Sequence, residues 1–117
     1  MSRQEFKART KAYALRVINV YDRLSRDTVA RTLGYQMLRA GTSVAANYRA
    51  AVRGRSTAEY VSKMGIVEEE CDESLLWMEL LIDSGRVDAK RLDALMKEGN
   101  EILAITVASI KTARRGR

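Results

Sequence analysis

The sequence predicts an all-α domain that folds as an antiparallel up-down-up-down four-helix bundle. The chain of 117 residues contains no proline and only seven glycines, so few positions interrupt a helix. Apolar residues recur every three or four positions in four segments, and short turn signals separate these segments. Long helices with such short connections pack antiparallel in sequence order. We therefore expect one domain that covers residues 1–117.

The first two predicted helices span residues 3–25 and 28–53. The apolar stripe of the first comprises Phe6, Tyr13, Val17, Val20, Tyr21 and Leu24. Asp27 or Thr28 can cap the second helix, because either side chain can accept a hydrogen bond from a free backbone N–H group. The stripe of the second helix comprises Leu33, Met37, Ala40, Val44, Tyr48 and Ala51.

The third predicted helix spans residues 57–84 and has the clearest start signal. Ser56 and Glu59 form a capping box, in which the serine bonds the Glu59 amide and the glutamate reaches back. Gly54 suits the end of the preceding helix, and Gly85 ends this one. A heptad-like seam runs along it and comprises Tyr60, Met64, Val67, Cys71, Ser74, Met78 and Leu81.

The fourth predicted helix spans residues 89–113, and Asp88 can cap its N-terminus. Its stripe comprises Leu92, Leu95, Met96, Gly99, Leu103, Thr106 and Ile110. We expect it to fray into a basic C-terminal tail, residues 111–117.

The net charge of +6 is unevenly distributed along the chain. Residues 1–55 contain 12 basic and 3 acidic residues, whereas residues 56–110 contain 5 basic and 12 acidic ones. Residues 111–117 add four positive charges. Two interpretations remain open: the two halves attract each other within or between chains, or the basic face contacts a polyanion.

The segment RAGTSVAANYRAA, residues 39–51, allows two interpretations. It resembles the turn and recognition helix of tetracycline-repressor-type regulators, which predicts a helix-turn-helix transcription regulator. Asn47 argues against this, because such a motif needs an apolar residue there to seat the recognition helix. We favour one continuous helix, in which the close approach of another helix compensates for Gly41.

In a continuous helix, Arg39, Ser43 and Asn47 form a polar row beside the apolar stripe. An antiparallel hairpin of the second and third helices places Glu70 opposite Arg39, and Glu73 one turn further along. A buried arginine requires a carboxylate partner. We therefore predict a bidentate Arg39–Glu70 pair in a polar core.

No feature of the sequence predicts an enzyme, a cofactor, a metal ion or a small-molecule substrate. Histidine is absent, and Cys71 is expected to pack on the seam of its helix. The acids of residues 68–73 lie on one helix, whereas di-metal bundles use ligands from facing helices. No apolar run reaches the roughly 18 residues of a membrane span. With no signal peptide apparent either, we expect a cytoplasmic protein.

Three motifs occur in order along the chain: RAGTSVAANYRAA, STAEYVSKM and EEECDESLLWMELL. Together they resemble the four helix bundle protein family, also called the 23S rRNA-intervening-sequence proteins. The matching positions are Arg39, Gly41, Thr42, Ser43, Ala46, Asn47, Ala51, Ser56, Lys63, Glu70, Glu73 and Trp77. Ala50 departs from the family pattern, which often has an acidic residue there. The helix pattern and this resemblance together predict a polar core, which comprises Arg39, Ser43, Asn47, Glu70, Glu73 and Trp77.

The resemblance implies a bundle that assembles into a ring, a pentamer, with no established activity. The sequence is also more distantly similar to the accessory proteins of diversity-generating retroelements, which are basic pentameric bundles that bind a reverse transcriptase and nucleic acid. We therefore expect a non-enzymatic homo-oligomer that contacts RNA, DNA or a nucleoprotein partner. The candidate contacts are Arg49, Arg53, Arg55, Lys111, Arg114, Arg115 and Arg117. The alternative is a structural protein–protein adaptor.

Overall fold

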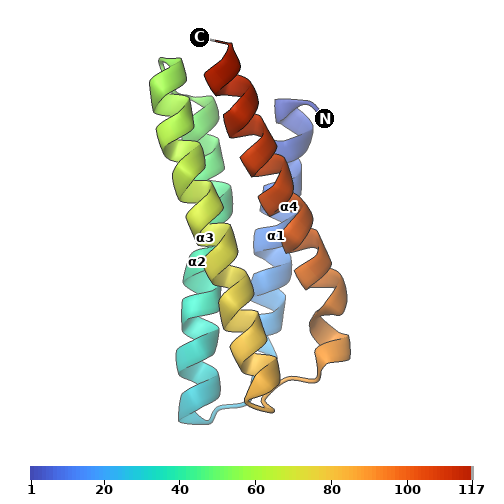
Figure 1. Ribbon diagram of the computed structural model, residues 1–117. Helices are drawn as coiled ribbons and strands as arrows, with labels where there is room; N and C mark the ends of the chain where they lie inside the picture. Colours follow the sequence, from blue (N-terminus) through green and yellow to red (C-terminus); the bar gives the residue numbers. More distant parts are fainter. Residues whose placement is uncertain (117) are drawn as a thin grey trace.

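The computed structural model describes residues 1–116, which contain four helices in the predicted antiparallel order (Figure 1). They are α1 (Arg3–Asp22), α2 (Thr28–Val52), α3 (Thr57–Asp83) and α4 (Ala89–Arg115). The bundle is elongated and extends over 48 × 21 × 20 Å. The predicted all-α fold and up-down-up-down topology are confirmed. None of the helices in residues 1–116 is long and apolar enough to cross a membrane.

The first predicted helix is three residues shorter than expected. α1 ends at Asp22, because the backbone of Arg23 leaves the helical conformation and the chain turns there. Leu24 therefore lies in the turn, and its side chain packs over Gly34 at the start of α2. Asp27 then caps α2, as predicted, by accepting a hydrogen bond from the Ala30 N–H group at 3.0 Å.

The fourth helix extends two residues beyond its predicted end at residue 113, so the prediction of a frayed tail was wrong for Arg114 and Arg115, which are helical. The reason is packing: Ile110 is 6% exposed and the half-buried Ala113 packs against the core, so the last turns of α4 are held in helical conformation. Lys111, Arg114 and Arg115 therefore project from a helix. Arg117 lies outside the described residues.

α2 is one continuous helix through residues 39–51, as the favoured interpretation predicted. The turn that a helix-turn-helix motif requires is not present there. Gly41 lies where α1 crosses α2, since a Cβ atom at this position would be 2.9 Å from both γ-carbons of Val17. This close approach explains the glycine in mid-helix, because any larger side chain would push the two helices apart.

The core runs the full length of the bundle. The heptad-like seam of α3 is confirmed, because all seven of its residues are buried. Large side chains from all four helices are fully buried against one another, and they include Tyr13, Met37, Val44, Met64, Met78, Leu92 and Ile102. Burial of these apolar surfaces is the main source of stability.

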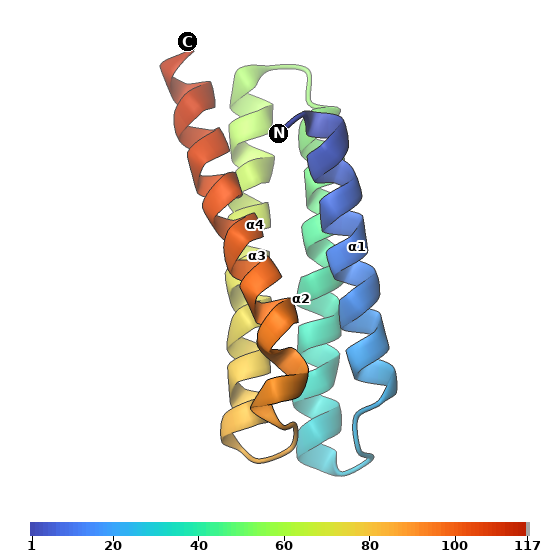
Figure 2. The same ribbon diagram turned by 90° about the vertical axis from the view of Figure 1, so that its right-hand side faces the viewer.

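The four helices do not pack equally tightly. α2 and α3 are in contact over their whole lengths, whereas α1 and α4 meet over only a short stretch. Figure 2 shows that α4 diverges from α1 toward the end of the bundle that holds both termini. α1 and α4 therefore separate at that end, and this divergence positions the site described next.

Candidate nucleic-acid interface

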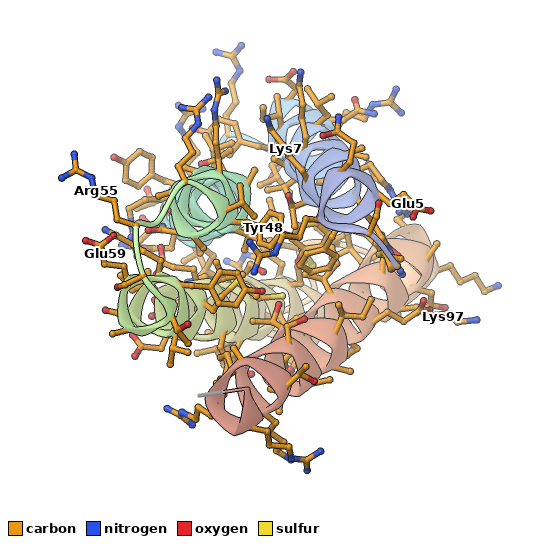
Figure 3. The ribbon with its side chains drawn as sticks, turned by 90° about the horizontal axis from the view of Figure 1, so that it is seen from above. Glu5, Lys7, Tyr48, Arg55, Glu59 and Lys97 are labelled. Carbon is orange, nitrogen blue, oxygen red and sulfur yellow. The ribbon has the colours of Figure 1, made fainter. Side chains whose placement is uncertain are left out.

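The start of α1, the α2–α3 turn and the end of α4 meet at one end of the bundle (Figure 3). We call residues 1–7, 49–63 and 111–116 the basic end. Its basic side chains are Arg3, Lys7, Arg49, Arg53, Arg55, Lys63, Lys111, Arg114 and Arg115. All of them are exposed except Lys7, which is half-buried.

The candidate contacts predicted from the sequence lie together at this end wherever the structure describes them. Antiparallel topology brings Arg49, Arg53 and Arg55 at the α2–α3 turn close to the C-terminal part of α4. Arg3, Lys7 and Lys63 also lie at this end, although the sequence did not identify them as candidate contacts. Arg3 could have been included from topology alone, because the start of α1 must lie beside the end of α4 in this fold.

The two acidic residues of the basic end, Glu5 and Glu59, both cap helices. Ser2 and Glu5 form a capping box, with the Ser2 N–H donating to the Glu5 carboxylate at 3.0 Å and the Glu5 N–H donating to the Ser2 hydroxyl at 3.0 Å. The hydrogen bond from the Ser2 backbone lowers the pKa of Glu5. Both acids are therefore committed to local structure.

The capping box predicted at the start of α3 is only half formed. The Ser56 hydroxyl accepts a hydrogen bond from the Glu59 N–H at 3.1 Å, as predicted. The Glu59 carboxylate, however, accepts the N–H of Arg55 at 2.6 Å, one residue before the expected partner. This bond fixes the α2–α3 turn and directs the Arg55 side chain outward (Figure 3).

Ion pairing within residues 1–116 involves none of the nine basic side chains of the basic end. The ion pairs join Arg9 to Glu98 and Glu101, Arg39 to Glu70 and Glu73, and Arg86 to Asp27. The positive charge of the basic end is therefore not neutralised by neighbouring carboxylates in the described part of the chain, and it produces a positive potential over this surface.

A groove about 460 Å³ in volume opens at the basic end between α1 and α4. Its aromatic residues are Phe6, Tyr48 and Tyr60, with the Phe6 and Tyr48 rings edge to face at a centroid distance of 4.8 Å. The guanidinium carbon of Arg3 lies 4.4 Å from the centroid of the Tyr60 ring, which is a cation–π contact. All three rings are buried, so they back the groove, and Arg3 holds a positive charge over Tyr60 at its wall.

The predicted buried Arg39–Glu70 pair was wrong in its burial and geometry. The two side chains do pair, but through a single contact of 3.4 Å, and Arg39 also contacts Glu73 at 3.6 Å. The Arg39 side chain is 47% exposed, because its row lies at the edge of the α2–α3 interface. An ion pair this exposed contributes little to the stability of the fold, because water screens the attraction between its two charges.

The other predicted core residues are not fully buried either. Ser43 and Asn47 are half-buried, and the Asn47 side-chain amide donates to the Ser43 carbonyl within α2 at 2.9 Å. Trp77 is half-buried, and its indole N–H, although buried, has no partner within residues 1–116. These residues therefore do not form one polar core.

The buried polar contacts lie between other residues. The Ser74 hydroxyl donates to the Cys71 carbonyl at 2.7 Å, so its oxygen must accept the hydrogen of the Tyr13 hydroxyl at 2.8 Å. The Cys71 thiol donates to the Gly99 carbonyl at 3.3 Å. Burial raises the pKa of Cys71 to about 12, so the thiol is neutral at pH 7. Cys71 packs in the core, as predicted.

The bidentate arginine of this bundle is Arg9. Its Nε and Nη2 atoms donate to the two carboxylate oxygens of Glu98, each at 2.7 Å, and Nη2 also donates to Glu101. The hydrogen bond to Glu98 raises the pKa of Arg9, and the Arg9 bond lowers the pKa of Glu98. This pair joins α1 to α4 where the two helices still meet.

The described residues contain no cluster of three or more His, Cys, Asp or Glu side chains that could hold a metal ion.

Residues 3–108 match the model of the 23S rRNA-intervening sequence protein family. The chain belongs to this family. The family match ends before Lys111, Arg114 and Arg115.

The fold is similar to a solved structure from Bacteroides thetaiotaomicron, a protein with unknown function from the S23 ribosomal protein family. The similarity covers 95% of this chain and 99% of that chain, with a TM-score of 0.88 and 29% sequence identity. No curated protein sequence matches the chain. The comparisons therefore support the four-helix fold and the family, and neither assigns a specific function.

Proposed function

We propose that this member of the 23S rRNA-intervening sequence protein family is a non-enzymatic protein that binds RNA through its basic end. One observation carries the proposal: nine basic side chains gather at one end of the bundle, and none of them is ion-paired within residues 1–116. Such a surface binds nucleic acid by displacing the counterions of the phosphate backbone. Because the family takes its name from intervening sequences of 23S rRNA, RNA is the first polyanion to test.

The arrangement favours binding without strong sequence preference. Eight of the nine basic side chains are exposed, and arginine and lysine at turns and helix ends contact phosphates rather than base edges. A cytoplasmic location, which is expected from the sequence, gives the protein access to RNA. Binding should weaken steeply as salt rises, because the release of counterions is then less favourable.

Assembly into a ring extends this proposal, and two exposed faces support it. On α1, Leu15 is 58% exposed and Ile18 is 37% exposed, in a helix rich in basic residues. On α3, exposed apolar side chains lie among acidic residues: Ile66, Leu76 and Leu80. Because α1 and α3 lie diagonally across the bundle from each other, their outer faces point in different directions. Pairing of α1 with α3 of the next copy gives a head-to-tail contact, which can close into a ring.

The ring number, a pentamer, comes from the family resemblance, and native mass spectrometry of the purified protein measures it. The exposed apolar side chains of α1 and α3 also favour the alternative function, a protein–protein adaptor. An adaptor should keep its protein contact when the basic end is altered.

The test of RNA binding compares two fourfold charge reversals. The first changes Arg53, Arg55, Arg114 and Arg115 to Glu at the basic end. The matched control changes Arg23, Arg26, Arg31 and Arg91 to Glu at the other end, so both variants differ from the native protein by the same charge. Fluorescence anisotropy with a labelled RNA at 50 mM salt measures each affinity.

We expect the affinity of the first variant to fall at least about a hundredfold and that of the control to change less than about threefold. The salt dependence of the first variant should also be shallower, by roughly one unit of slope for each phosphate that it no longer binds. Equal weakening of both variants, or no binding of RNA by the native protein at low salt, would refute the proposal.

A further inference from the structure

We propose that the groove between α1 and α4 at the basic end accommodates an unpaired nucleobase, so that the protein prefers single-stranded nucleic acid to a duplex. This inference rests on the proposed function, and it adds a substrate class that the charge of the basic end alone does not select. Positive charge attracts any nucleic acid, whereas a groove of this shape can accept only a base that is free to leave its stack.

The groove has room for a nucleoside. Its volume is about 460 Å³, which lies within the range of sites that bind small organic groups. The wall formed by α4 comprises Ile105, Ala108, Ser109, Thr112 and Ala113. This wall stands apart from α1 because α4 diverges there (Figure 2). Ala108 is exposed, so the groove is accessible from solvent on that side.

The other wall supplies a stacking surface. Arg3 lies 4.4 Å from the centroid of the Tyr60 ring, and it is exposed while Tyr60 is only 9% exposed. Tyr60 therefore supports the planar guanidinium group from the protein side. A planar, charged group held in this way can stack on a nucleobase. Unpaired bases of RNA are commonly recognised by stacking on aromatic rings and arginine guanidinium planes.

The surroundings match the rest of a nucleotide strand. A second hollow adjoins the groove and shares Arg3, Tyr60 and Ala113 with it, and Arg55 lies on its rim. Basic groups beside such a groove can bind the phosphates that flank an inserted base. The hydroxyl groups of Ser109 and Thr112 on the opposite wall can donate to or accept from a base edge. Charge complementarity therefore favours a nucleic-acid strand over an apolar occupant.

A duplex cannot use the groove without cost, because its bases are paired and stacked inside the helix. Insertion of a base from a duplex requires unpairing and unstacking, which a single strand avoids. The groove should thus add affinity for a single strand only, while the basic residues of the rim contribute to both.

The test measures affinity for a labelled 12-nucleotide RNA and for the blunt duplex of the same sequence, by fluorescence anisotropy at one salt concentration. Ala108→Leu places an aliphatic side chain in the groove and changes no charge. Ala94→Leu makes the same change at an exposed position near the start of α4 and is the matched control. We expect Ala108→Leu to weaken binding of the single strand about tenfold and to leave binding of the duplex unchanged. Ala94→Leu should change neither affinity.

A fluorescent base analogue provides a second measurement on the native protein. We expect the emission of 2-aminopurine in the single strand to fall on binding, because stacking quenches it, and the quenching to be abolished in Ala108→Leu. Unchanged duplex binding shows that this variant is folded.

The outcomes separate the two proposals. If neither RNA binds, the proposed function is wrong and this inference falls with it. If both RNAs bind equally tightly, or if Ala108→Leu leaves single-strand binding and 2-aminopurine emission unchanged, only the groove inference is wrong. A change in assembly mass caused by Ala108→Leu, with RNA binding unaffected, would instead assign the groove to a second copy of the chain.

Discussion

The two ends of the bundle differ in packing and charge. At the basic end α1 and α4 diverge around a groove, and there are nine basic side chains and only two acidic ones. At the opposite end two short turns connect the helices, and charges of both signs alternate. We define the opposite end as residues 20–31 and 83–93, which contain six basic and five acidic side chains. There, Arg86 of one turn pairs with Asp27 of the other at 3.4 Å. Both ends are built from the same four helices, so the difference lies in local packing and charge.

The opposite end is locally well determined. Gly85 adopts a φ of 78°, a conformation that glycine enters without strain, and the Arg86 N–H donates to the Leu81 carbonyl at 2.9 Å. Asp27 accepts hydrogen bonds from Ser25 and Ala30. The comparison indicates that α1 and α4 stay together toward the opposite end and diverge at the basic end, which carries unpaired charge and an open groove.

The largest expected effect comes from truncating one aliphatic side chain at each end of α4. Leu92 at the opposite end is fully buried, whereas Ile105 is half-buried and lines the groove. Leu92→Ala should lower the free energy of unfolding by about 3 kcal/mol and Ile105→Ala by about 1 kcal/mol, because the cavity left by Leu92 cannot be filled by solvent. Urea denaturation measures both, and equal decreases would show that the two ends are packed alike.

The part of the fold that the sequence predicts is the part that depends on periodicity within one helix. The seam of α3, from Tyr60 to Leu81, is buried throughout, because residues three and four apart must share a face. Periodicity places Arg39 beside the stripe of α2 but does not decide how far the neighbouring helix covers it. Its burial was therefore predicted wrongly, although its contact with Glu70 was predicted correctly.

Contacts between helices that are not consecutive in the chain cannot be predicted from periodicity, because periodicity describes one helix at a time. Tyr13 and Ser74 belong to α1 and α3, and no pattern within either helix identifies the other as a partner. The candidate interface shows the same division. Topology alone brings Arg55 to the end of the bundle that holds α4's C-terminus, whereas the placement of Arg3 over Tyr60 depends on how α1 packs across α3.

A smaller effect is expected from the charge of Asp27, and it depends on pH. The hydrogen bond from the Ser25 hydroxyl, followed by that from the Ala30 N–H and the nearby Arg86, lowers the pKa of Asp27 to about 2. An unfolded aspartate has a pKa of about 4, so folding is stabilised above that pH, and the stabilisation is lost as the pH falls from about 4 to about 2.

Asp27→Asn tests this, because asparagine can still cap α2 but carries no charge. The variant should have a lower Tm than the native protein at pH 7, and the two values should converge near pH 2. Asp22→Asn, which removes an acid that forms no ion pair within residues 1–116, is the control. A difference between native protein and Asp27→Asn that stayed constant with pH would mean that the charge of Asp27 does not stabilise the opposite end.

The smallest expected effect compares two arginines in equivalent positions. Arg55 directly precedes Ser56, the N-cap of α3, and Arg26 directly precedes Asp27, the N-cap of α2. A cation is unfavourable beside a helix N-terminus, because the helix dipole is positive there. Near Arg26 the Asp27 carboxylate offsets this repulsion, whereas near Arg55 the only carboxylate of the turn, Glu59, is bonded to the backbone and other cations surround it.

Arg55→Gln should therefore raise the free energy of unfolding at low salt by about 0.5 kcal/mol, and Arg26→Gln should leave it nearly unchanged. The gain should disappear at high salt, because the repulsion is screened. The same Arg55→Gln change should weaken RNA binding, whereas Arg26→Gln should not. If Arg55→Gln raises the free energy of unfolding but lowers the affinity for RNA, then Arg55 contributes to binding at the expense of stability. This result would link the charge of the basic end to function. Lower stability in Arg55→Gln would show instead that Arg55 is part of what holds this turn together.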